Sequence, residues 1–228
     1  MKRRAKHPVI AIDGPAGSGK STVSRMVAAN IGVMYIDTGA MYRALTLKAM
    51  RGGISLEDED SLATLAHSVK IDLEDSGSGQ KVFLDGEDVT GLIRTPELTN
   101  NVKYIARVPA VRREMVRLQR IIGNKGGAVM EGRDIGTVVF PDADYKFYLD
   151  ADADERARRR HKELAEAGVE ADLEDIKKDV TARDESDMKR AVGARKVAPD
   201  AILVDTTNLS IDEVVGRLLG FVRQETNR

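Results

Sequence analysis

The fold follows from one stretch near the N-terminus, Gly14-Pro15-Ala16-Gly17-Ser18-Gly19-Lys20-Ser21. It matches the pattern G-x-x-x-x-G-K-[ST], in which glycines let the backbone curl so that N–H groups point at phosphate oxygens. The apolar residues 9–13 before it predict a buried strand, and residues 20–31 after it carry apolar side chains at helical spacing. A glycine-rich loop between a strand and a helix predicts a phosphate-binding loop rather than an ordinary helix cap.

The residue types of this loop predict its roles. Lys20 can reach the outer phosphates of a nucleotide, and the Ser21 hydroxyl can ligate Mg²⁺. The glycine spacing does not fit G-x-G-x-x-G, which excludes a dinucleotide-binding Rossmann loop. The expected phosphate-binding residues are Gly14, Pro15, Ala16, Gly17, Ser18, Gly19, Lys20, Ser21 and Thr22.

Composition narrows the class of protein. The 228 residues fit one large domain, and 36 basic against 37 acidic residues give no general attraction to nucleic acid or to an anionic membrane. The chain has no cysteine, which excludes disulfides, thiolate metal sites and cysteine nucleophiles. The basic residues 2–4 precede no long apolar segment, so we expect a cytoplasmic protein. We also expect it to be a monomer.

Hydrophobic patterning predicts an α/β fold. Apolar runs predict strands at residues 9–13, 34–36, 128–130, 145–149 and 201–204. Helical patterns cover residues 20–31, 39–50, 96–106, 110–122, 155–167 and 172–187, and Ser210 to Glu213 has the spacing of a capping box that opens a last helix. Strands that alternate with helices predict a parallel sheet. Strands at 69–73 and 81–84, separated by turn residues 75–79 and followed by Asp85-Gly86, predict a small antiparallel insertion.

A phosphate loop by itself does not define a reaction. A guanine-nucleotide switch would need Asn-Lys-x-Asp, and the nearest stretch, Asn124-Lys125-Gly126-Gly127, lacks the acidic residue. A phosphotransferase needs arginines that hold a second anionic substrate. The candidates are Arg43, Arg112, Arg133, Arg156, Arg158, Arg159, Arg160, Arg183 and Arg190. Arg43 and Arg133 follow predicted strands, where α/β proteins bind ligands. The basic residues 156–162 fit either a solvated helix or a lid over the nucleotide.

Several further stretches, taken with the loop, resemble bacterial cytidylate kinases over residues 10 to about 222. They are Ile12-Asp13-Gly14-Pro15, Asp37-Thr38-Gly39-Ala40-Met41-Tyr42-Arg43, residues 84–90, residues 132–141, Arg183-Asp184, Asp187 and Arg190-Ala191-Val192. The resemblance implies a P-loop core with a parallel sheet flanked by helices. It also implies a single domain over residues 1–228, with an antiparallel CMP-binding insertion at about 60–105 and a short lid at about 152–187. The implied reaction is transfer of the γ-phosphoryl group of ATP to CMP and dCMP with Mg²⁺.

The resemblance also implies site residues. The expected CMP contacts are Thr38, Arg43, Arg112, Glu131, Arg133, Asp134, Arg183, Asp187 and Arg190. Of these, Arg43, Arg133 and Arg190 would lie near phosphate, Arg183 and Asp187 near the ribose hydroxyls, and Arg112 and Asp134 near cytosine. Lys20, Arg43, Arg133 and Arg190 are the expected catalytic residues, and Arg156 and Arg160 of the lid are expected to contact ATP.

The chemistry of cytosine agrees with that assignment. Its N4 amino group donates to a carboxylate, and its N3 and O2 accept from an arginine, whereas uracil presents a carbonyl in place of N4. Leaving a buried polar group unpaired costs ~1–3 kcal/mol, which predicts a clear preference for cytosine over uracil. Two residues depart from the family pattern: Glu131 replaces an aspartate, and Lys103 replaces a small serine. Transfer to another nucleotide or to a small-molecule alcohol, and a non-catalytic nucleotide-binding regulator, remain the alternatives.

Overall fold

A five-stranded parallel sheet forms the centre of the molecule. The computed structural model describes residues 7–226 except 77–78 and 167. The strands are β1 (Val9–Asp13), β2 (Met34–Asp37), β6 (Ala128–Gly132), β7 (Tyr145–Asp150) and β8 (Ile202–Asp205), in the spatial order β2-β6-β1-β7-β8. Asp13 is in register with Gly132, and Asp37 with Glu131. The strands therefore end together and bring these polar residues to one edge.

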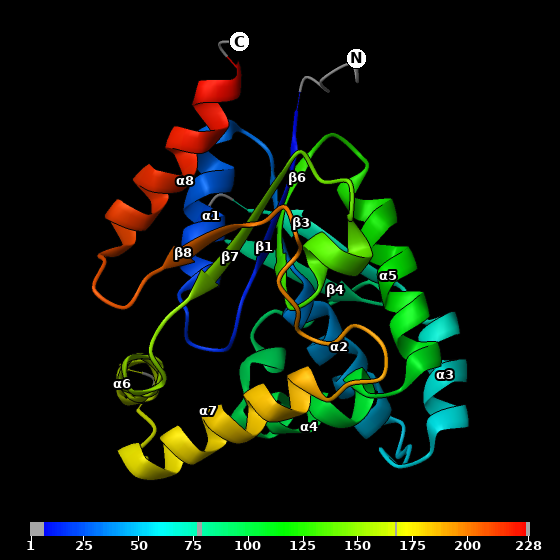
Figure 1. Cartoon of the computed structure of the whole chain (residues 1–228). Coiled ribbons are helices and arrows are strands. Elements are labelled where there is room, and N and C mark those ends of the chain that lie inside the picture. The colour runs from blue at the N-terminus through cyan, green and yellow to red at the C-terminus, as the bar shows by residue number, and fades with distance from the viewer. Residues whose placement is uncertain (1–6, 77–78, 167, 227–228) are drawn as a thin grey trace.

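Helices cover both faces of the sheet (Figure 1). One face carries α1 (Lys20–Ile31) and α8 (Ile211–Thr226), and the other carries α2 (Thr38–Arg51), α3 (Glu59–Ser68) and α5 (Pro109–Gly123). Side chains alternate along a strand, so Ile10 and Ile12 of β1 pack in the α1/α8 core while Ala11 packs in the other core. Burial on both faces explains why β1 reads as a continuous apolar run.

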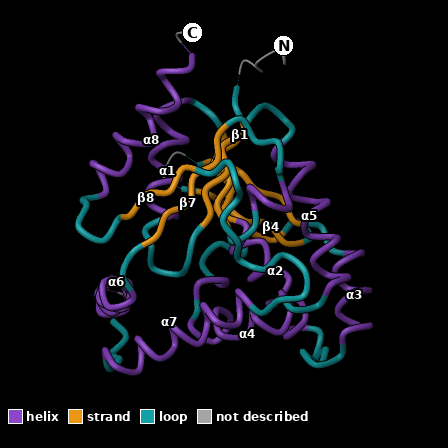
Figure 2. Tube along the Cα trace, viewed as in Figure 1, coloured by secondary structure: helices purple, strands orange, loops and turns teal. Residues whose placement is uncertain are grey.

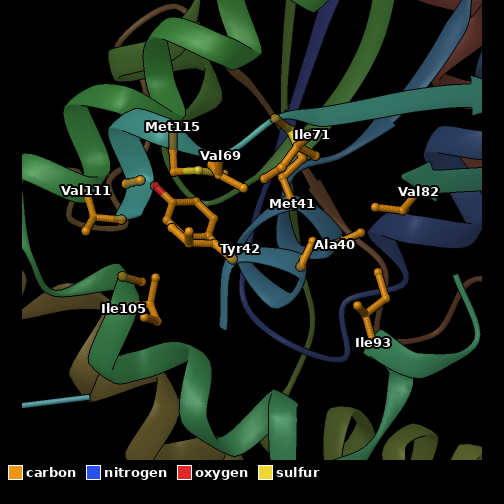
Figure 3. Packing of buried hydrophobic residues seen from close by; sticks show 14 of the residues in the cluster. Ala40, Met41, Tyr42, Val69, Ile71, Val82, Ile93, Ile105, Val111 and Met115 are labelled. Atoms are coloured by element: carbon orange, nitrogen blue, oxygen red, sulfur yellow. The ribbon is translucent and has the colours of Figure 1, made fainter. Parts of the chain in front are cut away.

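A second, antiparallel sheet lies beside α2. It contains β3 (Ile71–Asp75), β4 (Gln80–Leu84) and β5 (Glu87–Asp88). Asp85 (φ +51°) and Gly86 (φ +90°) form the two-residue turn between β4 and β5, as expected for a hairpin with both central residues left-handed. Ile71 and Val82 pack with Met41 of α2 (Figure 3). The predicted fold class, a parallel sheet flanked by helices with a small antiparallel sheet, is confirmed.

The remaining elements gather at the edge where the parallel strands end. They are the short η1 (Leu92–Arg94), α4 (Pro96–Ala106), the π-helical turn η2 (Ile135–Val139), α6 (Ala153–Glu166) and α7 (Leu173–Met188). In Figures 1 and 2, α7 runs past the lower ends of the strands. No helix in residues 7–226, as far as these are described, is long and apolar enough to cross a membrane.

The predicted elements differ from the observed ones mainly at their ends. The capping box is present, because Ser210 Oγ accepts from the Glu213 N–H at 3.3 Å and Glu213 Oε2 accepts from the Ser210 N–H at 2.8 Å. Helix α3 was not predicted, and the parts of the predicted turn and helix at residues 77–78 and 167 lie outside the described residues.

Asp13, the last residue of β1, fastens the backbone that follows β6. Its Oδ1 accepts from the Ile135 N–H at 2.8 Å and its Oδ2 from the Gly136 N–H at 2.7 Å. Burial outweighs these hydrogen bonds and raises the pKa of Asp13 from 3.8 to about 6. The carboxylate is thus held in place at the centre of the edge but is destabilised in its ionised form.

This pKa predicts how stability depends on pH. Because the folded-state pKa of Asp13 is raised, the folded state binds the proton more tightly, so the contribution of Asp13 to stability falls as pH rises from about 4 to about 6. The difference corresponds to about 3 kcal/mol. Denaturant unfolding at several pH values should show that the free energy of unfolding falls less with rising pH in Asp13→Asn than in the wild type. The exposed Asp142→Asn variant is the control, and equal pH dependence in all three proteins would contradict the assignment.

Candidate active site

The predicted phosphate loop joins β1 to α1 and has a backbone that requires glycine. Gly17 (φ +77°) and Gly19 (φ +83°) are left-handed. A Cβ atom on Gly14 would lie 2.0 Å from the Leu149 carbonyl oxygen, and one on Gly17 would lie 2.9 Å from the Arg156 carbonyl oxygen. The loop is therefore packed closely between the end of β7 and the start of α6.

Lys20 is buried at the first turn of α1. Its Nζ donates to the Pro15 carbonyl oxygen and, at 3.3 Å, to Ser18 Oγ. Burial, followed by the positive charge of Arg133, lowers the pKa of Lys20 to about 7, and Arg183 acts in the same direction. The lysine of the phosphate loop therefore lies within electrostatic reach of Arg133, directly after β6, and of Arg183 in α7.

Four arginines gather opposite the loop, and we call Arg43, Arg133, Arg183 and Arg190 the arginine cluster. Asp187, 1% exposed, lies within it: its Oδ2 accepts from Arg133 Nε at 2.8 Å and its Oδ1 accepts from Arg190 Nη2. Burial, together with the charges of Arg133, Arg43 and Arg190, lowers the pKa of Arg183 to about 10 despite Asp187. The cluster has more positive than negative charge and is suited to an added anion.

Arg43 reaches the cluster from α2, at the end of β2. Its Nη2 lies 2.9 Å from Asp37 Oδ2, while Asp37 Oδ1 accepts from the Ala40 N–H at 2.9 Å and caps α2. The cap residue thus also orients the arginine. Thr38, the first residue of α2, donates from Oγ1 to the Glu131 carbonyl oxygen at 2.7 Å.

The two residues that depart from the family pattern lie in different surroundings. Glu131 is buried, and its Oε1 accepts a hydrogen bond from the Tyr35 hydroxyl. Burial, reinforced by the charge of Asp37, raises the pKa of Glu131, while Lys20, Tyr35 and Ser21 act in the opposite direction. Glu131 therefore faces the phosphate loop. Lys103 is exposed on α4, with its Nζ 5.1 Å from the centroid of the Tyr104 ring.

Arg112 and Asp134 form a buried ion pair. Arg112 Nη2 lies 2.5 Å from Asp134 Oδ2, and the side chains are 3% and 8% exposed. The Arg112 guanidinium stacks 5.6 Å above the centroid of the Tyr42 ring, which Figure 3 shows beside Val111 and Met115. Among the described residues, Arg112 Nε and the Tyr42 hydroxyl are buried without a hydrogen-bond partner. This region therefore contains polar groups that a bound molecule could satisfy.

The basic helix α6 divides into a buried and an exposed part. Arg156 Nη1 donates to the Ala16 carbonyl oxygen at 3.1 Å and pairs with Asp184 Oδ2 at 2.7 Å. Arg160 instead pairs with the neighbouring Glu163 at 3.1 Å, with its side chain 38% exposed. Of the two arginines predicted at the donor nucleotide, the structure brings Arg156 to the phosphate loop and leaves Arg160 in a local surface pair.

Three further residues belong to the site. Asp13 and Tyr35 were given no role from the sequence, and Arg159 was named only as one of the candidate arginines. Asp13 fixes η2, and Tyr35 holds Glu131, as described above. Arg159 donates to the Thr206 carbonyl oxygen at 2.6 Å, and Thr206 Oγ1 donates to the Ser18 carbonyl oxygen at 3.3 Å. The sequence signal for Arg159 was its position three residues after Arg156, which places both on one helix face.

Two cationic regions therefore face each other at one edge of the sheet. One is the phosphate loop with Lys20, and the other is the arginine cluster, of which Arg133 and Arg183 act on the charge of Lys20. Arg112 and Asp134 lie next to the cluster, because Arg112 contributes to the electrostatic environment of Arg190. Such an arrangement can hold two phosphate-bearing molecules with their phosphates adjacent.

Comparison with known proteins agrees with this geometry. The cytidylate kinase family model matches residues 10–224. The cytidylate kinase of Anoxybacillus flavithermus (strain DSM 21510 / WK1) is 52% identical over 215 residues, which cover 94% of this chain and 96% of that protein. The cytidylate kinase of Desulfitobacterium hafniense (strain Y51) is 51% identical over 214 residues, which cover 94% and 92%.

A solved structure shares the fold at low sequence identity. It is an uncharacterized protein from Eubacterium ventriosum ATCC 27560, with a TM-score of 0.52 and 10% identity over 95% of this chain and 99% of that chain. This similarity concerns the fold alone. The family model and the relatives at about half identity extend over almost the whole chain and include the loop and the arginine cluster, so the chain belongs to the cytidylate kinase family.

Proposed function

We propose that this chain transfers the γ-phosphoryl group of ATP to CMP, and to dCMP, giving ADP and CDP or dCDP. The observation that carries the proposal is that the phosphate loop lies close to the arginine cluster. Arg133 and Arg183 are near enough to Lys20 to lower its pKa. A loop that binds one anion and an arginine cluster that binds another are what direct transfer between two phosphates requires. The names of the relatives supply the base of the acceptor.

The donor half of the site would consist of residues 14–22 and Arg156. The loop would surround the phosphates of ATP, and Lys20 would exchange its bonds to Pro15 and Ser18 for bonds to the β- and γ-phosphates. Arg156 would act from the adjacent α6, through the side chain that already contacts Ala16. Arg160 could contribute only after giving up its pair with Glu163.

The proposed metal is Mg²⁺, with Ser21 as its protein ligand. Among the described residues, no group of three or more His, Asp or Glu side chains could hold a metal ion. This fits Mg²⁺ rather than a protein-only site, because Mg²⁺ in kinases takes one or two protein ligands and otherwise phosphates and water. When bound, the ion would neutralise charge on the β- and γ-phosphates.

The acceptor half would use the arginine cluster and the Arg112–Asp134 pair. The phosphate of CMP would lie among Arg43, Arg133 and Arg190, and Arg183 and Asp187 would contact the ribose. Asp134 would accept from the cytosine N4 amino group, and Arg112 would donate to N3 or O2. Thr38 and Glu131 would act as supports, because their observed partners are the Glu131 carbonyl oxygen and the Tyr35 hydroxyl.

The chemical step needs little beyond alignment and charge. An oxygen of the CMP phosphate would attack the γ-phosphorus while the bond to the β–γ bridging oxygen breaks, leaving ADP. The attacking phosphate is already ionised at neutral pH, so no general base is required. Lys20 on the donor side and the arginine cluster on the acceptor side would neutralise charge on the transferring group. We also propose that the protein is a cytoplasmic monomer that acts on small nucleotides. Its balanced charge gives no general attraction to nucleic acid or to an anionic membrane.

An acceptor panel tests the function. ADP release coupled to a reporter reaction would be followed with ATP, Mg²⁺ and each of CMP, dCMP, UMP, AMP and GMP. We expect the highest kcat/KM for CMP or dCMP and a value for UMP lower by roughly five- to 150-fold, the equivalent of ~1–3 kcal/mol. Absence of turnover with all five acceptors would reject the proposed kinase activity. A clear preference for another acceptor would reject the proposed recognition of cytosine.

Lys20→Ala tests the role of the loop lysine. Loss of its charge at the outer phosphates should lower kcat by on the order of 10²-fold or more. Steady-state kinetics with CMP would measure the effect, and Lys178→Ala, at a lysine whose side chain is 75% exposed, is the matched control. Turnover near that of the wild type in Lys20→Ala would show that the assigned role is wrong.

Arg190→Ala tests the separation of the two anion sites. Arg190 pairs with Asp187 in the arginine cluster, and its removal should lower kcat/KM for CMP by on the order of 10²-fold. The Kd for ATP, measured by calorimetry without CMP, should stay within about twofold of the wild type. Arg158→Ala, at an exposed arginine of α6, controls for loss of a surface guanidinium. A parallel loss of ATP affinity would instead assign Arg190 to the donor site.

A further inference from the structure

Gly193 lies directly against the Arg112–Asp134 pair. It has a left-handed backbone (φ +65°), and a Cβ atom built on it would lie 2.1 Å from Arg112 Nη2 and 2.3 Å from Asp134 Oδ2. Those are the two atoms that bond each other across the pair. The Gly193 backbone is therefore in direct contact with the polar atoms proposed to recognise the base.

This contact buries the pair. The side chains of Arg112 and Asp134 are 3% and 8% exposed, and a base can bond to them only where their edges are open. Two polar atoms of the same region, Arg112 Nε and the Tyr42 hydroxyl, are buried without a partner among the described residues. Gly193 thus occupies a position beside polar groups that are built for a ligand but are closed to one in this arrangement.

The segment around Gly193 is held by few contacts. Downstream, the Arg195 N–H donates to the Asp187 carbonyl oxygen at 2.9 Å, and Arg195 Nη1 donates to the Tyr148 hydroxyl at 3.1 Å. Its Nη2 lies 3.9 Å from Asp184 Oδ2. Upstream, Arg190 pairs with Asp187, and Ala191 and Val192 after it are exposed. Arg195 is therefore the main side-chain anchor of the segment.

Space is present next to the segment. Val192 lines an open groove of about 430 Å³ together with Val116, Ile121 and Val138. The groove borders α5 and η2, so the chain at residues 191–194 can shift toward it without displacing the core. A segment with one main side-chain anchor, exposed neighbours and adjacent free volume can move at low cost.

We infer that residues 191–195 form a plug over the base-recognition pair, which must withdraw before a pyrimidine can contact Arg112 and Asp134. This inference rests on the proposed function, because it takes the pair to be the reader of the base. The apparent Kd for CMP then equals the intrinsic Kd divided by the fraction of molecules in which the plug is withdrawn. Weakening the seated position of the plug, without touching the pair, should make CMP bind more tightly.

Gly193→Ala tests the plug directly. The φ of +65° is strained for alanine whatever the space, and the added methyl group would press on Arg112 Nη2 and Asp134 Oδ2, so the seated position is disfavoured. Calorimetry should give a Kd for CMP at least about threefold lower than that of the wild type, with the Kd for ATP unchanged. Gly53→Ala is the matched control, because Gly53 has the same φ of +65° and nothing within 4 Å of the added atom. It should leave both Kd values unchanged.

Arg195→Met provides an independent variant if Gly193→Ala fails to fold. It keeps an unbranched, flexible side chain but removes the guanidinium bonds to Tyr148 and Asp184, and Asp184 keeps its pair with Arg156. The Kd for CMP should again fall while that for ATP stays constant. An unchanged or raised Kd for CMP in a folded variant would overturn the plug. Failure of the wild type to bind CMP would instead reject the proposed function, so the two failures are distinguishable.

Discussion

The arginine cluster depends on one buried carboxylate, that of Asp187. Although burial acts in the opposite direction, the charges of Arg133, Arg190 and Arg183 hold the pKa of Asp187 below its ordinary value. Without this carboxylate, the guanidinium groups of Arg133, Arg183 and Arg190 would repel one another in a region of low dielectric. Asp187 lies in the last turn of α7, so the same interaction fixes that helix across the ends of the parallel strands.

Helix α7 also joins the two halves of the site. Asp184 and Asp187 are three residues apart and therefore share one face of the helix. Asp184 pairs with Arg156, which contacts the phosphate loop, whereas Asp187 pairs with Arg133 and Arg190 in the arginine cluster. A phosphate that enters the cluster competes with Asp187 for the guanidinium groups. It therefore weakens contacts of α7, the helix whose Asp184 holds Arg156 at the phosphate loop. The contacts of one helix can thus link occupation of the two sites.

The sequence predicted the features that depend on local patterns. Glycine spacing located the phosphate loop, and the ends of predicted strands located Arg43 and Arg133. Helix α3 had a recognisable start, because Asp58 Oδ1 accepts from the Ser61 N–H at 3.1 Å, but its apolar pattern is short. Contacts between distant residues, such as Tyr35 with Glu131, have no local signature and could not be predicted.

The two predicted lid arginines show the same limit. Arg156 and Arg160 are four residues apart on one basic helix, and nothing in the sequence separates them. What separates them is the tertiary structure, because Asp184 of α7 and the Ala16 carbonyl oxygen reach Arg156 only. Asp187 was likewise expected at the site only through the resemblance, since its partners lie directly after β6 and beyond the end of α7.

The main polar groups of the site are already paired within the chain. Lys20 bonds to Pro15 and Ser18, and Arg112 bonds to Asp134. A correct ligand exchanges these bonds for bonds of similar strength, so its net gain is far smaller than the sum of its contacts. A wrong ligand breaks the internal bonds and leaves buried charged groups without partners, which is costly. Internal pairing therefore favours discrimination over tight binding, as suits an enzyme that must release its product.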